Sequence, residues 1–241
     1  MSDILKSSRR AFLRGSVAAA AGAVTAGAAR AATPDPLITE VQDWASGLGQ
    51  GVDEVPYGLP IEFESDVIRR NVEWLTADTI SSINFTPIHA LDGTITPQGC
   101  AFERHHSGAI ELKKEDYRLM INGLVDRPLV FTYADLERFP RENHVYFCEC
   151  AANTGMEWRG AQLNGVQYTH GMVSSSEWTG VVLSTLLREA GVGDAAKWIL
   201  VEGADSAGLS RSLPIKKALD DCIVAYAQNG EMLRPEQGYP L

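Results

Sequence analysis

The 241-residue sequence has few cysteines, no haem-attachment motif and no internal repeats. Its four cysteines, at positions 100, 148, 150 and 222, are too sparse for a disulfide scaffold. The absence of Cys-x-x-Cys-His excludes a covalently attached c-type haem. The absence of heptads and repeats excludes a coiled coil and a solenoid. At this length the chain can bury one sizeable core.

Residues 1–31 have the pattern of an export signal. SSRRAFLRG, residues 7–15, places two arginines before Phe-Leu, and an Ala/Gly/Val run and a small-residue site at residues 29–31 follow. This pattern resembles the twin-arginine signal, whose route carries folded proteins, often with a complex cofactor already inserted. The apolar run is too short to serve as a membrane anchor. We therefore expect a periplasmic protein with a cofactor and without a membrane anchor.

Basic residues are also scarce, because 21 Lys and Arg stand against 31 Asp and Glu, giving a formal charge of -10. Loss of residues 1–31 removes five basic side chains and one acidic side chain, which leaves about -14. This charge argues against nucleic acid or an anionic membrane as a partner. It favours a basic partner protein, and it is equally compatible with plain solubility.

The rest of the chain divides into an arm, residues 32–83, and a domain, residues 84–241. The arm is rich in Pro and Gly, with one short helix predicted over Glu64–Trp74. The domain mixes strands with short helices, which indicates the α+β class. Two strands are predicted at 117–121 and 129–131, followed by a capped helix at 132–139 and a buried strand at 144–150. An amphipathic helix is predicted from Thr179 to Gly191. A second buried strand at 196–205 runs into a loop at 203–208, and the stretch 223–233 is a strand into a turn at Asn229-Gly230.

Cys148 and Cys150 pose the main chemical question. In a strand they share one face with Cα atoms about 6.5 to 7 Å apart, at the upper limit for a disulfide. Small residues follow, and these let a bulky group approach the backbone. Four interpretations of Cys150 remain open. It could be a buried core thiol or the single thiolate ligand of a larger cofactor. It could also bind zinc together with Cys148, His144 or His170, or act as a nucleophile paired with His105, His106 or His144.

A family resemblance favours the last of these alternatives. Cys-Ala-Ala-Asn at 150–153, followed by MEWRG, resembles the sulfite oxidase family of molybdenum enzymes. ECAANTGMEWRGAQLNGVQYTHGM and SSEWTGVVLSTLLREAGV are similar to the sulfane dehydrogenase branch of that family, and the likeness extends from about residue 84 to the C-terminus. It implies a sulfite oxidase-type molybdopterin-binding fold and a molybdenum-molybdopterin cofactor. Cys150 would supply the thiolate, which suits a soft metal, and Cys148 would lie in the core.

Further site residues follow from the same resemblance. CAFERHHSG, residues 100–108, is similar to the segment that lines the pterin and the substrate pocket, so Phe102, Arg104 and His106 are expected to bind the cofactor. Arg104 would also orient an anionic sulfur oxide as a catalytic residue beside Cys150. Asp205, in EGAD, would contact the pterin. Each of these residues also has a purely structural alternative: Arg104 could bridge surface carboxylates, and Asp205 could cap a turn. His170 is a weaker candidate for a residue of this site.

The resemblance implies oxidation of a sulfur substrate by oxygen-atom transfer, with electrons passed to a cytochrome c subunit. Where sulfite oxidases carry two arginines, this chain has Thr154 and Gly155. The loss of anion-binding charge favours sulfane sulfur bound to a sulfur-carrier protein over free sulfite. A sulfite dehydrogenase and an inactive remnant are the alternatives. Relatives continue beyond Leu241 with a cofactor-binding arginine and an immunoglobulin-like dimerisation domain, so we expect a partial domain with an open cofactor pocket.

Overall fold

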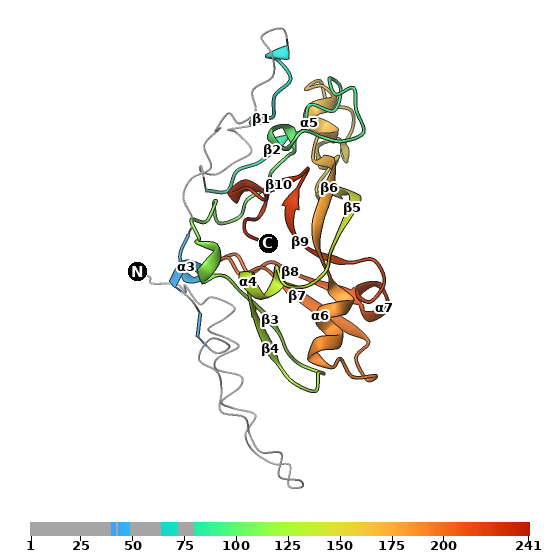
Figure 1. Cartoon of the computed structure of the whole chain (residues 1–241). Coiled ribbons are helices and arrows are strands. Elements are labelled where there is room, and N and C mark those ends of the chain that lie inside the picture. The colour runs from blue at the N-terminus through green and yellow to red at the C-terminus, as the bar shows by residue number, and fades with distance from the viewer. Residues whose placement is uncertain (1–39, 42, 49–63, 72–79) are drawn as a thin grey trace, which may run out of the picture. The chain divides into compact units, whose positions relative to one another are not determined.

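The computed structural model describes residues 40–41, 43–48, 64–71 and 80–241 (Figure 1). The predicted signal peptide and most of the predicted arm lie outside these residues. The described parts of the arm contain a one-turn helix, α3 (Asp43–Ser46), and a short strand, β1 (Arg70–Asn71). β1 pairs antiparallel with β2 (Asn84–Phe85). The helix predicted over Glu64–Trp74 is therefore wrong for its described part, because pairing with β2 keeps the backbone extended.

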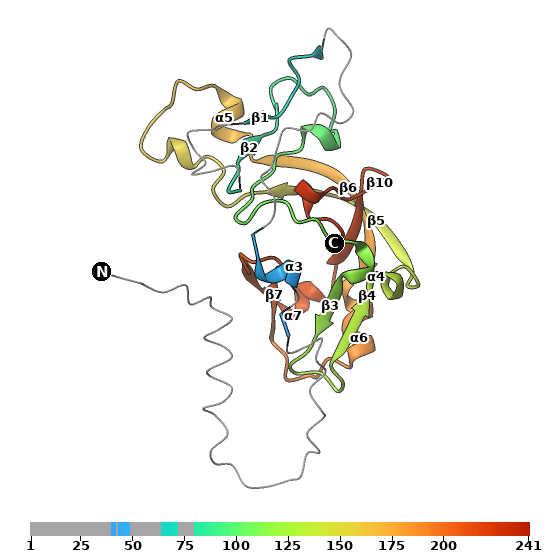
Figure 2. The same ribbon diagram turned by 90° about the vertical axis from the view of Figure 1, so that its left-hand side faces the viewer.

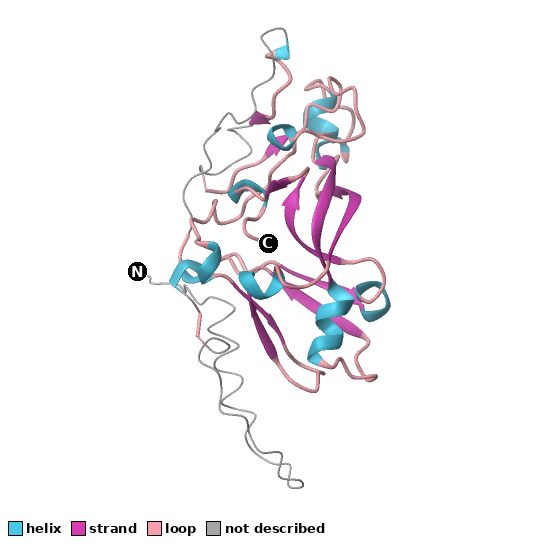
Figure 3. Cartoon of the chain, viewed as in Figure 1, coloured by secondary structure: helices cyan, strands magenta, loops and turns pink. Residues whose placement is uncertain are grey.

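A four-stranded antiparallel sheet forms the centre of the domain (Figure 3). Its strand order is β10 (Glu231–Met232), β9 (Ile223–Gln228), β6 (Val173–Val182) and β5 (Arg141–Glu149). The register of β5 and β6 runs from Arg141 opposite Val181 to Glu149 opposite Val173. β9 and β10 form a hairpin around the predicted turn, in which Asn229 and Gly230 take left-handed backbone angles.

The remaining elements confirm the predicted α+β class. Two further antiparallel pairs occur, β3 (Arg118–Ile121) with β4 (Leu129–Thr132), and β7 (Trp198–Glu202) with β8 (Ser210–Pro214). The short helices are α4 (Tyr133–Leu136), α5 (Val166–His170), α6 (Leu183–Ala190) and α7 (Ile215–Ala218), with 3-10 turns η3 (Gln98–Cys100), η4 (Lys114–Asp116), η5 (Gly155–Glu157) and η6 (Pro235–Gln237). In the part of the chain that the structure describes, every helix is too short or too polar to span a bilayer.

Local signals placed most of these elements correctly. Thr132 and Asp135 form a capping box at the start of α4, and Leu136 is buried in a cluster with Phe131 and Leu186. α6 ends at Gly191 in a left-handed cap, as predicted. Its predicted start at Thr179 is wrong. Residues 178–181 pair with both β5 and β9, and Val182 pairs with β9, so ladders of hydrogen bonds hold them extended.

The strands predicted to be buried, β5 and β7, are largely exposed. β5 is an edge strand of the sheet, and its Phe147 is 73% exposed. Trp198 and Leu200 on β7 are 62% and 70% exposed. Cys148, predicted to lie in the core, is exposed as well. An apolar strand is buried only when another layer covers it, and no described residue covers these faces.

Candidate functional site

Cys150 comes directly after β5, which ends at Glu149. Figure 2 shows α5 beside β2. Its amide donates a hydrogen bond of 3.0 Å to the carbonyl of Met172, which continues the β5–β6 pairing one step beyond the strand. The thiol side chain packs beside a buried cluster of Phe85, Phe102 and Met172, and it is partly exposed. Cys150 is therefore positioned by the sheet and is still accessible to a ligand.

The turn after Cys150 is held by Asn153. Its side-chain oxygen accepts a hydrogen bond of 3.1 Å from the Met172 amide, and its side-chain nitrogen donates one of 3.0 Å to Glu149. The Asn153 amide donates to the Cys150 carbonyl at 2.9 Å, which closes the turn. Ala151 and Ala152 lie exposed within it. The small side chains thus leave room beside the thiol, as the sequence indicated.

Thr154 follows with a left-handed backbone at φ 64°. This conformation is unusual for a β-branched residue and costs about 1 to 3 kcal/mol. The Thr154 amide donates to the Thr169 carbonyl at 2.9 Å, so the turn is tied to α5. Strain of this kind persists where the surroundings fix the backbone, and here the fixed backbone is the turn that presents Cys150.

An extended segment, residues 102–106, passes beside this turn. The carbonyl of Glu103 accepts from the Asn84 amide, and the His105 amide donates to the Ser82 carbonyl, so the segment runs antiparallel to residues 82–84. Side chains of an extended segment alternate between two sides. Phe102 packs beside Cys150, and the alternation directs Arg104 to the same side as Phe102. That Phe102, Arg104 and His106 bind the cofactor stays a prediction.

Among the residues that the structure describes, Arg104 pairs with no carboxylate, although pairing with surface carboxylates was the alternative for this residue. Its Nη1 donates to the carbonyls of Ser82 and His105 and to the hydroxyl of Ser81. These acceptors anchor one end of the planar guanidinium against the neighbouring strand. Guanidinium groups carry donors on both nitrogen arms, so an anchored arm orients the other one.

His106 and Asp205 are brought together, although they lie in different segments. Desolvation lowers the pKa of His106, the Arg104 guanidinium lowers it further, and the Asp205 carboxylate acts in the opposite direction. Arg211 on β8 also contributes to lowering this pKa. The hydrogen bond of Ser107 to Asp205 places this carboxylate beside the segment that carries His106. With its pKa lowered, His106 is more often neutral near pH 7 than an isolated histidine.

Ser107 and Ser206 belong to the same site and were not recognised in the sequence. The buried Ser107 hydroxyl donates to Asp205 at 2.7 Å, and the Gly208 amide donates to the same carboxylate at 3.2 Å. The hydroxyl oxygen of Ser206 is buried and has no hydrogen-bond partner among the described residues. A buried polar atom of this kind is satisfied by a bound polar group. Serines give no distinctive sequence signal, which explains why they were missed.

The competing interpretations of Cys150 have less support. Within the described residues, no three His, Cys, Asp or Glu side chains gather in a way that could hold a metal ion, so the zinc alternative has no ligand set there. His144 stacks on Tyr146 and pairs with Glu142, and His170 faces Thr169 and Glu157. All four cysteines are free, so none forms a disulfide.

Cys100, Cys148 and Cys222 have raised thiol pKa values. Desolvation is the largest cause of the rise in each pKa. The thiolate is the form that binds a metal. These three residues therefore favour the protonated thiol. For Cys148, the neighbouring Cys150 adds to the rise.

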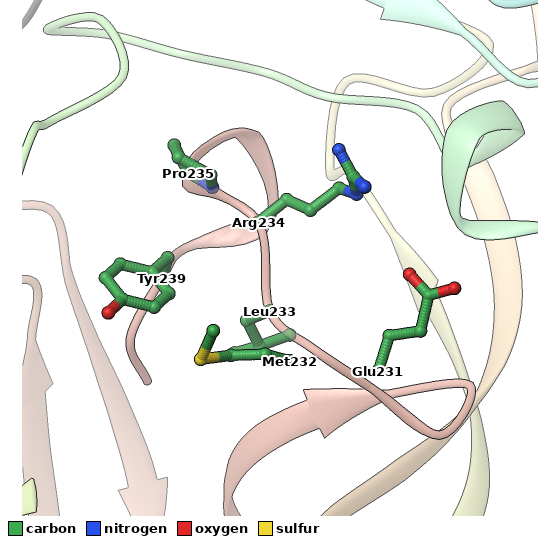
Figure 4. Close-up of a pocket in the computed structure, with 6 residues that line it drawn as sticks. All are labelled: Glu231, Met232, Leu233, Arg234, Pro235 and Tyr239. Atoms are coloured by element: carbon green, nitrogen blue, oxygen red, sulfur yellow. The ribbon is translucent and has the colours of Figure 1, made fainter. Parts of the chain in front are cut away.

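A separate pocket of about 420 Å³ lies at the C-terminal segment (Figure 4). In Figure 4 the side chains of Glu231 and Arg234 extend to one side of this segment, and those of Met232 and Tyr239 extend to the other. None of the predicted site residues lines it. The Cys150 site instead offers a partly exposed thiol, an apolar cluster beside it, and polar groups around Asp205. That composition fits a large, polar cofactor held through one metal-thiolate bond.

Comparisons with known proteins agree with this composition. The model of the oxidoreductase molybdopterin binding domain matches residues 106–241. A solved structure, the sulfane dehydrogenase SoxCD from Paracoccus pantotrophus, is 66% identical with a TM-score of 0.73, covering 87% of this chain and 54% of that one.

Curated relatives include plant and algal enzymes. The NADH nitrate reductase of Ulva prolifera is 31% identical over 65% of this chain and 20% of its own length. NADH nitrate reductase 1 of Phaseolus vulgaris is 35% identical over 62% of this chain and 18% of its own length. The chain thus spans about half of the solved relative and about a fifth of these nitrate reductases.

Proposed function

Because the chain belongs to the oxidoreductase molybdopterin-binding domain family, we propose that it acts in oxidation of a sulfur substrate, with sulfane sulfur on a carrier protein as the preferred form. The predicted sulfite oxidase-type fold and the molybdenum-molybdopterin cofactor are confirmed by the family match and by the solved relative. When bound, this cofactor supplies oxygen-atom transfer and a redox-active metal. The single observation that carries the proposal is the placement of Cys150, a partly exposed thiol fixed at the end of β5.

The chain's own residues have separate roles in this proposal. Cys150 holds the metal as a thiolate, and Phe102 forms an apolar wall beside it. His106 and Asp205 hold the pterin, and Ser107 orients the Asp205 carboxylate. Arg104 holds the anionic sulfur oxide with the arm that the neighbouring strand does not engage.

The choice of sulfane over sulfite is supported by two features. Thr154 and Gly155 occupy the turn after Cys150 and bring no positive charge there. A small dianion such as sulfite gains most from paired arginines at its binding site. The solved relative, at 66% identity, is named as a sulfane dehydrogenase, whereas the two nitrate reductases share 31% and 35%.

The partners and the location follow as part of the same proposal. We place the protein in the periplasm, exported through the twin-arginine signal at residues 1–31. The chain has no haem-attachment motif of its own, so a cytochrome c subunit takes the electrons one at a time.

A substrate comparison tests the proposal. The protein is purified with its cofactor and supplied with oxidised cytochrome c, and either sulfite or a carrier protein bearing sulfane sulfur is added. We expect cytochrome reduction at least about tenfold faster with the carrier-bound substrate. Faster reduction with sulfite would identify a sulfite dehydrogenase. A purified chain without molybdenum and without turnover would identify an inactive chain.

A further inference from the structure

Glu103 is the centre of a buried polar network on the side of the 102–106 segment that faces away from Cys150. Its side chain is 2% exposed, and it accepts hydrogen bonds from the side chains of Asn84 and His105. The His105 Nε2 lies 2.9 Å from Glu103 Oε2, and Arg69 Nη1 lies 3.4 Å from Glu103 Oε1. Arg69 and His105 are 10% and 11% exposed. The carboxylate is therefore desolvated and paired on several sides.

Arg69 links this network to three parts of the chain. Besides Glu103, its guanidinium reaches the Ala101 carbonyl at 3.4 Å and the Glu236 carboxylate at 3.8 Å. The neighbouring Gln237 donates to the carbonyls of both Ala101 and Phe102. The segment that carries Phe102 is thus held from one side by Arg69 and from another by η6.

The next residue of the same short segment reaches the thiol cluster. The Arg70 guanidinium lies 5.6 Å from the centre of the Tyr168 ring, and Tyr168 packs edge-on against Phe85. Both rings belong to the cluster on which Cys150 packs. Residues 69 and 70 therefore contact both sides of the candidate site, although they lie outside the family-matched residues 106–241.

From these contacts we propose that Arg69, Glu103 and His105 form a positioning network that fixes Arg104 and His106 for cofactor and substrate. The inference rests on the proposed function of the Cys150 site. In an extended segment the two sides move together, so a rotation that displaces Glu103 also displaces Arg104 and His106. A buried carboxylate that loses its cationic partner is left uncompensated and seeks water. Removing Arg69 therefore releases the segment, and the site residues lose their alignment.

The test compares Arg69→Ala, Arg69→Lys and Glu103→Gln in the full chain. Arg127→Ala is the matched control, because it removes an exposed arginine-glutamate pair of 2.7 Å from the surface. Amide hydrogen exchange is followed by mass spectrometry for peptides covering residues 98–107, with peptides of β6 as the internal reference. Dissociation of molybdenum-molybdopterin is measured on the same samples.

We expect Arg69→Ala to speed exchange in residues 98–107 and to speed cofactor dissociation, each by about 10- to 100-fold, with β6 unchanged. Glu103→Gln should speed both processes as well. Arg69→Lys should keep the exchange rate and the cofactor dissociation rate close to those of the wild type, and Arg127→Ala should match the wild type. An unchanged exchange rate of residues 98–107 in Arg69→Ala would overturn the network. So would an equal increase in the exchange rate of β6, because the effect would then not be local. Faster local exchange with unchanged cofactor dissociation would overturn its positioning role. A wild-type chain that holds no cofactor would count against the proposed function, and the exchange comparison would still decide the network.

Discussion

The Ser107 hydroxyl donates a hydrogen bond of 2.7 Å to the Asp205 carboxylate, which joins segments 98 positions apart in the chain. Ser107 ends the segment that carries Arg104 and His106, and Asp205 begins the loop that leads to β8. The pair thereby brings two sequence motifs, CAFERHHSG and EGAD, to one place. The family resemblance assigned both motifs to a cofactor, and this hydrogen bond supplies a physical connection between them.

Ser107→Ala should destabilise the protein by about 1 to 3 kcal/mol, because the substitution removes a buried donor to a carboxylate. Urea unfolding measures the difference. Ser206→Ala is the matched control, since its buried hydroxyl has no partner among the described residues, and we expect no loss of stability there without cofactor. Equal losses in the two variants would contradict the importance of the Ser107 bond.

Cys150→Ser should lower the molybdenum content by at least about tenfold, because the hydroxyl is a poor ligand for a soft metal. Cys148→Ser is the control, and its metal content should equal that of the wild type. Metal analysis of the purified proteins gives the ratio directly. Loss of molybdenum from Cys148→Ser, or its retention in Cys150→Ser, would show that the two cysteines have been assigned the wrong roles.

The pKa of His106 should lie below its ordinary value of 6.5. Asp205→Asn should lower it further, since the carboxylate favours the protonated ring, and Arg104→Gln should raise it. NMR titration of the ring protons measures all three. A higher His106 pKa in Asp205→Asn, or a lower one in Arg104→Gln, would contradict the arrangement of charges around the ring.

The same pKa predicts how stability depends on pH. The unfolded chain binds more protons than the folded one between the lowered pKa and 6.5, so the contribution of His106 is present above this window and is lost as the pH falls through it. The free energy of unfolding of His106→Gln should therefore fall less steeply with acid than that of the wild type. Salt should weaken only the part of the difference that comes from the charges of Arg104, Asp205 and Arg211.

Phe147→Ser should change the free energy of unfolding by no more than about 0.5 kcal/mol, because this side chain on β5 is largely exposed. Phe85→Ala, which empties a buried position beside Cys150, should cost about 3 to 5 kcal/mol. Urea unfolding of both variants makes the comparison. A large loss in Phe147→Ser would show that another layer covers β5 in solution.

Gly171→Ala should destabilise the turn beside Cys150. An added Cβ would lie 2.2 Å from the Gln167 carbonyl oxygen and 2.8 Å from that of Thr86, so backbone must shift. Overpacking of this kind costs about 1 to 3 kcal/mol. Gly93→Ala is the control, because its nearest neighbour is 3.8 Å away. Similar unfolding curves for the two variants would contradict the close approach of these backbones.

Local patterns predicted the elements whose geometry depends on neighbouring residues in the sequence. Thr132 and Asp135 begin α4 with a capping box, Gly191 ends α6, and Asn229-Gly230 turns the hairpin. Each depends on hydrogen bonds or backbone angles within a few residues. The residues around Cys150 left four interpretations open, and the resemblance of Cys-Ala-Ala-Asn and its flanking motifs to a known family implied the cofactor, which the family match confirms.

The sequence by itself therefore determined the α+β class, the cofactor and the order of the motifs. Only the tertiary structure decided which strand faces are covered by another layer of the protein. An apolar alternation in β5 and β7 predicts a face and cannot say whether another layer packs on it, so both strands were wrongly predicted to be buried. The start of α6 was set by strand pairing on both sides of β6. The contact of Arg69 with Glu103 joins residues 34 positions apart, and such contacts arise only when the chain folds.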